Sequence, residues 1–80
     1  MKPIEIIYRK LGQHKALGLA WTEDNLIEID ERIKAFEHLE VVIHEVIHIQ
    51  NPKWSEIKVE GHAKQLAKIL WSMGYRKCDL

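Results

Sequence analysis

The chain has 80 residues, and its 12 basic and 12 acidic side chains give a formal net charge of zero. A chain of this length makes one domain, residues 1–80, close to the lower limit for a self-sufficient hydrophobic core, and the balanced charge excludes a typical nucleic-acid-binding surface. The longest apolar run is too short for a membrane span, and the single cysteine, Cys78, cannot form an internal disulfide, which favours a reducing, cytoplasmic location.

Short strands are predicted in the N-terminal part of the chain. Ile4 to Tyr8 is rich in β-branched and aromatic residues, and the glycine-containing segment 11–15 that follows is typical of a turn. Ala16 to Trp21 is the second predicted strand. After a polar turn, Leu26 to Asp30 alternates partly between apolar and acidic residues, as a strand with two different faces does. We therefore expect a three-stranded antiparallel sheet, with a hairpin between the first two strands.

Two helices are predicted in the rest of the chain. Asp30 is the predicted N-cap of the first, which runs from about Glu31 to Gln50 and ends at Asn51-Pro52. Ser55 should cap the second helix, and Gly74 should end it. Because only a short connection separates these helices, they should be antiparallel neighbours. The predicted fold is thus an α+β domain in which the sheet packs on a helix hairpin.

The first predicted helix contains the pentapeptide His44-Glu45-Val46-Ile47-His48, an H-E-x-x-H motif. Residues four apart lie one turn above one another on a helix, so both imidazoles can reach a single metal ion. Glu45 lies about 100° around the helix from the first histidine, where its carboxylate can contact a metal-bound water without coordinating the metal. The motif therefore predicts a zinc ion bound by His44 and His48, with Glu45 as the general base.

The motif leaves a third zinc ligand to be found, because catalytic zinc usually takes three protein ligands and a water. The predicted hairpin turns just after His48, so the opening turns of the second helix should pass close to the metal. Glu56 and Glu60 are four residues apart on one face of that helix, and His62 lies on a neighbouring stripe. Spacing alone leaves these three residues open as the third ligand.

H-E-x-x-H on one helix, followed by E-x-x-x-E on the next, resembles the gluzincins, the zinc peptidases that include thermolysin. The pattern is also similar to the small ImmA-like metallopeptidase domains of bacteria and their phages. The resemblance covers about residues 18–74, and its specific part is the two short motifs. It implies a zincin-like fold and zinc-dependent hydrolysis of peptide bonds.

Carried over to this sequence, the resemblance assigns a role to each motif residue. His44 and His48 correspond to the zinc-binding histidines, and Glu45 corresponds to the general base. Glu56 corresponds to the glutamate ligand, and Glu60 to the acid that accepts a ring N–H from a histidine ligand and so fixes its tautomer. The interval between His48 and Glu56 is shorter than in thermolysin-like enzymes, so Glu60 stays the alternative third ligand.

These residues lead us to expect a zinc metallopeptidase that acts on a peptide or protein. Glu45 would take the proton of the water, and the strand Leu26 to Asp30 would pair as a sheet edge with an extended substrate. Larger relatives place a histidine or tyrosine over the substrate carbonyl, and His62, Tyr8 and His14 are the candidates here. The alternative is a non-catalytic binding module whose metal is structural or absent. A homodimer or a partner protein could complete the cleft.

Overall fold

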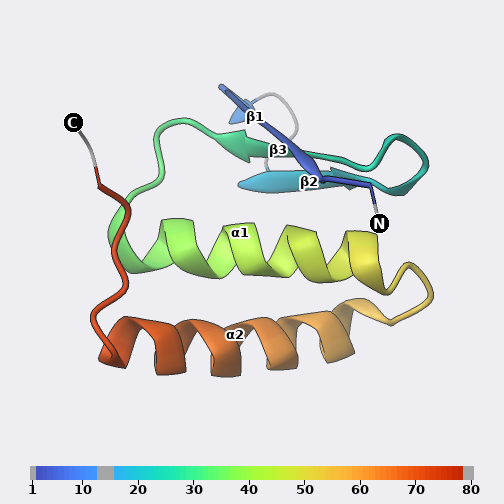
Figure 1. Ribbon diagram of the computed structural model, residues 1–80. Helices are drawn as coiled ribbons and strands as arrows, with labels where there is room; N and C mark the ends of the chain where they lie inside the picture. The colour runs from blue at the N-terminus through green and yellow to red at the C-terminus, as the bar shows by residue number, and fades with distance from the viewer. Residues whose placement is uncertain (1, 13–15, 79–80) are drawn as a thin grey trace.

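The chain folds into a sheet, a central helix and an outer helix, in a computed structural model that describes residues 2–12 and 16–78. The described elements are β1 (Glu5–Arg9), β2 (Gly18–Trp21), the 3₁₀ helix η2 (Thr22–Asp24), β3 (Leu26–Asp30), α1 (Ala35–Gln50) and α2 (Glu56–Ser72). The sheet lies on one side of α1, and α2 runs antiparallel to α1 on the other side (Figure 1). The α+β class and the antiparallel helix pair are confirmed. His14 and the end of the predicted turn at 11–15 lie outside the described residues.

The sheet is mixed, so the prediction of a fully antiparallel sheet is wrong. Its strand order is β1-β3-β2, with β2 antiparallel to β3 and β1 parallel to β3. β1 and β2 therefore lie on opposite sides of β3, and the predicted hairpin between them does not form. The apolar pattern explains this order. Ile27 and Ile29 of β3 are fully buried, and the central strand of a sheet is the one whose side chains lose most contact with water.

Helix α1 begins later than predicted, at Ala35, and Asp30 does not cap it. Asp30 is buried, and its carboxylate accepts hydrogen bonds from the backbone N–H groups of Leu11 and Arg32. The guanidinium of Arg32 also donates to this carboxylate, at 2.7 Å. These bonds, those from Arg32 first, hold the pKa of Asp30 well below its usual range. The carboxylate thus fastens the end of β3 to the loops around it instead of starting the helix.

Helix α2 has the predicted ends. The hydroxyl oxygen of Ser55 accepts a hydrogen bond from the backbone N–H of Lys58, at 3.2 Å, as an N-cap does. At the other end Gly74 takes a positive φ of 95°. The N–H of Tyr75 then donates to the carbonyl of Leu70, at 3.1 Å, in the pattern that closes a helix with a left-handed residue. Both predicted boundary residues are confirmed.

Apolar side chains on both sides of α1 hold the helix in place. The inner face of β3 supplies Ile27 and Ile29 on the sheet side, and Val59 and Ala63 of α2 pack with Ile47 on the other side. Ile47 lies inside the H-E-x-x-H motif, so this contact fixes the motif against the first turns of α2. Among the described residues, no helix is long and apolar enough to cross a membrane.

Candidate metal centre

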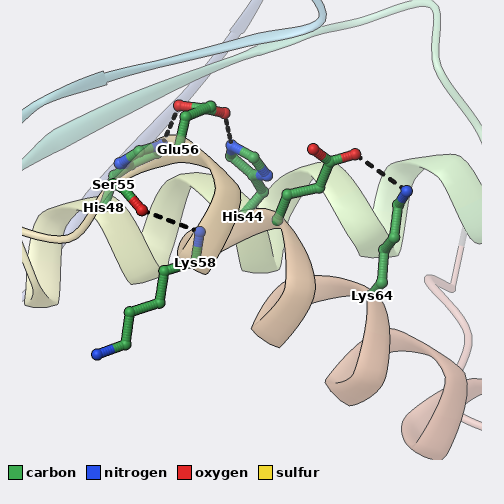
Figure 2. A network of polar contacts seen from close by, with 7 residues as sticks. His44, His48, Ser55, Glu56, Lys58 and Lys64 are labelled. Carbon is green, nitrogen blue, oxygen red and sulfur yellow. Dashed lines mark hydrogen bonds and ion pairs between the residues drawn. The ribbon is translucent and has the colours of Figure 1, made fainter.

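Three side chains from the two helices converge at the turn between them. His44 and His48 project from α1 towards the carboxylate of Glu56, which is the first residue of α2 (Figure 2). The Nε2 atom of His44 is 2.6 Å from Oε1 of Glu56, and the Nε2 atom of His48 is 2.9 Å from Oε2. One possible ligand atom from each residue lies within 4.8 Å of the others. The three residues therefore form a group that could hold a metal ion.

Local structure accounts for this convergence. The spacing of four residues on α1 brings the rings of His44 and His48 to a centroid separation of 4.9 Å. The Ser55 cap starts α2 at Glu56, so the glutamate has a defined position next to the end of α1. The side chains of the two histidines are 19% and 21% exposed, whereas that of Glu56 is 67% exposed. The group is thus half-buried on the histidine side and open to solvent on the glutamate side.

Glu45 lies beside this group and is buried, with 9% of its surface exposed. Burial raises the pKa of the Glu45 carboxyl, and the neighbouring His44 and His48 partly offset that effect. Strand β2 passes directly over the side chain. A Cβ atom placed on Gly18 would lie 2.9 Å from Cγ and 3.0 Å from Oε2 of Glu45. Glycine is therefore what allows β2 to approach the carboxylate so closely.

A pocket of about 300 Å³ opens over the group. It is lined by His44, Glu45 and His48 of α1, by Pro52 and Glu56, and by the segment Gly18, Leu19, Ala20 and Thr22. A larger pocket of about 520 Å³ lies at the opposite end of α1, beside Lys34 and Arg76, and contains none of the motif residues. The pocket at the motif thus combines the His/His/Glu group, the buried carboxylate and the backbone of β2.

Glu60 is engaged elsewhere in this structure. Its Oε1 atom is 3.0 Å from Nζ of Lys64, one turn further along α2. Pairing with Lys64 lowers the pKa of the Glu60 carboxyl. Of the two glutamates between which spacing could not choose, Glu56 is the one that contacts both histidines.

Two of the three candidates for a group over a substrate carbonyl, Tyr8 and His62, lie away from the pocket. The ring of His62 lies against Trp54, with centroids 4.8 Å apart. The hydroxyl of Tyr8 is 2.9 Å from Nε2 of His38. His14 lies outside the described residues. Neither Tyr8 nor His62 lines the pocket at the motif.

The prediction that the strand Leu26 to Asp30 pairs with the substrate is wrong. This strand is β3, and both of its edges are already paired, with β1 and with β2. The strand beside the pocket is β2 instead, which the sequence prediction did not associate with the site. One signal was available. Gly18 stands inside a predicted strand, and a glycine in that position often marks a close approach of backbone to another group.

The fold and the site together define the class of protein. It is an α+β domain with a His/His/Glu group that could hold a metal ion, next to the buried Glu45. No family model matches the chain, and no curated protein or solved structure matches it either. The resemblance to gluzincins therefore rests on the two motifs and on the meeting of His44, His48 and Glu56.

Proposed function

We propose that this chain is a zinc-dependent metallopeptidase in which His44, His48 and Glu56 bind the metal and Glu45 is the general base. The observation that carries the proposal is the His/His/Glu group, with ligand atoms within 4.8 Å of one another, beside a buried carboxylate that is not part of it. Two imidazoles and one carboxylate are a donor set that zinc accepts, and three protein ligands leave its fourth position open.

Without a metal, the contacts of Glu56 with His44 and His48 would contribute little to the free energy of unfolding. Glu56 is mostly exposed, and an ion pair on the surface adds only about 0–1 kcal/mol. Zinc bound there would polarise a carbonyl group and make water a stronger acid. The three side chains therefore do little for the stability of the fold by themselves, and their donor atoms suit a bound metal ion.

Glu45 has the properties of a base for this reaction. Its carboxyl is buried, and burial raises its pKa, so the group binds a proton more readily than an exposed glutamate. The carboxylate lines the same pocket as the two histidines. In the proposed mechanism Glu45 accepts a proton from the attacking water and then delivers it to the leaving amine.

The outer edge of β2 supports an extended peptide as the substrate. The N–H of Asp30 donates to the carbonyl of Leu17, and in an antiparallel pair such bonded residues alternate along the strand. Gly18 and Ala20 therefore direct their N–H and C=O groups away from β3. Both residues line the pocket. A peptide that paired with them as an added strand would lie across the His/His/Glu group.

The test compares the wild-type chain with Glu45→Gln in zinc content and in cleavage of a mixed peptide library, read by mass spectrometry. We expect about one zinc per chain in both proteins and a loss of cleavage of about 100-fold or more in the variant. Glu37→Gln makes the same change at an exposed position of α1 and should alter neither quantity. A wild-type chain that neither contains zinc nor takes it up would refute the proposal.

The second candidate is a zincin-like module that binds an extended peptide without cleaving it, with a structural metal or none. The lining of the pocket favours this function. Apart from the proposed ligands and base, the described lining residues offer a developing oxyanion only the hydroxyl of Thr22 and backbone N–H groups, whereas hydrolysis needs well-placed donors there. Peptide binding and product release by the wild type and by Glu45→Gln distinguish the two functions. A binding module would retain peptides equally well in the wild type and in Glu45→Gln, and would release no products.

A further inference from the structure

Strand β1 forms the edge of the sheet opposite to β2, and all five of its residues are exposed. Three of them are large and apolar: Ile6 is 45% exposed, Ile7 39% and Tyr8 41%. Within residues 2–12 and 16–78, β3 is the strand that pairs with β1, so its outer edge carries no partner strand there. An apolar strand with an open edge is a surface suited to pairing with another chain.

The hydrogen bonds at the two ends of β1 show which of its backbone groups face outward. The N–H of Glu5 donates to the carbonyl of Asn25, and the N–H of Glu31 donates to the carbonyl of Arg9, both at 3.0 Å. In a parallel pair, alternate residues make both of their bonds to the same neighbouring strand. Glu5, Ile7 and Arg9 therefore direct their backbone groups to β3.

The remaining two residues, Ile6 and Tyr8, direct their N–H and C=O groups away from the sheet. These groups are spaced as an antiparallel partner strand requires. If β1 meets a second β1 about a twofold axis at Ile7, Ile6 lies opposite Tyr8 of the partner subunit, and the pair exchanges two N–H···O bonds. The symmetry repeats this exchange on the other side of the axis.

The charges of β1 are self-complementary in the same register. The strand reads Glu5-Ile6-Ile7-Tyr8-Arg9, so the twofold axis places Glu5 opposite Arg9 of the partner subunit. The Nε atom of Arg9 is 2.7 Å from Oε2 of Glu28, yet the side chain is 54% exposed. A guanidinium has five N–H donors and can serve both carboxylates. Parallel pairing in register would instead place like charges side by side.

We propose that this chain forms a homodimer through antiparallel pairing of β1 with β1 of a second copy, which joins two sheets into one. The paired edge is not the edge of β2, so the pocket at His44 and His48 stays open in the dimer. The proposal therefore stands independently of the catalytic one. A pair of five-residue strands buries less surface than a standard interface, so the dimer should dissociate on dilution.

Sedimentation of the full chain over a concentration series tests the proposal. The wild type should shift from 9.4 kDa towards twice that mass as concentration rises. Ile6→Pro removes an outward N–H without touching the bonds to β3, and an edge strand tolerates proline there. This variant should stay monomeric, whereas Ile6→Val, which keeps the N–H, should still dimerise. Circular dichroism of each variant checks that the fold is retained.

A charge reversal gives a second test that does not depend on proline. Glu5→Arg alone and Arg9→Glu alone each place like charges opposite one another and should raise the dissociation constant about tenfold or more. An equal mixture of the two variants should dimerise again, because each arginine then meets a glutamate. A wild type that stays monomeric at every concentration would overturn the proposal. Ile6→Pro, Glu5→Arg alone or Arg9→Glu alone dimerising as well as the wild type would overturn it too.

Discussion

The carboxylate of Glu45, the proposed base, lies close under the backbone of Gly18, where there is no room for a side chain. A Cβ atom at Gly18 would be 2.8 Å from Cγ1 of Val41 and 2.9 Å from Cγ of Glu45, distances at which something must move. Neither atom belongs to the His/His/Glu group. The position of the base and the binding of the metal are thus separable at this residue.

If the proposed mechanism holds, Gly18→Ala should lower cleavage at least about tenfold, because it would displace the Glu45 carboxylate from the attacking water. Zinc affinity should stay close to that of the wild type. The free energy of unfolding should fall by about 1–3 kcal/mol, as overpacking of a full site does. Cleavage rates, chelator titration and thermal melting measure these three quantities.

Gly61→Ala is the matched control for this change. A Cβ atom there would meet nothing within 4 Å. Because Gly61 lies within α2, alanine should stabilise the protein by about 0.5–1 kcal/mol and leave cleavage unchanged. If Gly18→Ala cleaved as fast as Gly61→Ala, the contact with Glu45 would have no part in the reaction.

The start of α2 decides which glutamate faces the histidines. Ser55 caps the helix, so Glu56 occupies the first turn beside the end of α1. Glu60 lies one turn later, where it pairs with Lys64. The helix boundary thus places Glu56 against both histidines, and it is Glu56 that we propose as the third ligand.

Glu56→Ala should weaken zinc binding much more than Glu60→Ala. Loss of a ligand removes a metal bond, whereas loss of an outer partner typically costs about 10- to 100-fold and Glu60 is bound to Lys64 here. A competition titration with a zinc chelator compares the two variants. A larger effect of Glu60→Ala would exchange their roles, and an effect of His62→Ala alone would indicate a three-histidine site.

At the scale of the whole molecule, the metal would add stability that a small core cannot supply. Within residues 2–12 and 16–78, seven apolar residues are buried, and α1 covers one face of the sheet. The proposed ligands come from α1 and from the first residue of α2, so a bound ion would tie the two helices together where the chain turns. Binding free energy in such a domain is folding free energy.

Zinc at a hundredfold excess over its dissociation constant should stabilise the fold by about 2.7 kcal/mol. For a domain of this size, that corresponds to a rise in Tm of about 10–20 °C. Melting curves with zinc and with a chelator measure the difference, which His44→Ala should abolish. An equal Tm under both conditions would show that the metal does not bind to the folded chain.

Features that depend on near neighbours in the chain were determined by the sequence itself. The strand Leu26 to Asp30, the cap at Ser55 and the stop at Gly74 all lie where their residue types predict. The spacing of His44 and His48 likewise needs only a helix to bring the two rings together. These features follow from the backbone and side-chain preferences of a few consecutive residues.

Tertiary structure alone decided the features that depend on distant contacts. Which strand becomes central depends on how much apolar surface each one buries, and this placed β3 between β1 and β2. Asp30 is held by local bonds from Arg32 and by one distant bond, from the N–H of Leu11, and it does not cap α1. The choice of Glu56 and the approach of Gly18 to Glu45 depend on how α2 and β2 pack on α1. No local pattern encodes the strand order or the approach of Gly18 to Glu45, because both bring together residues that are far apart in the chain.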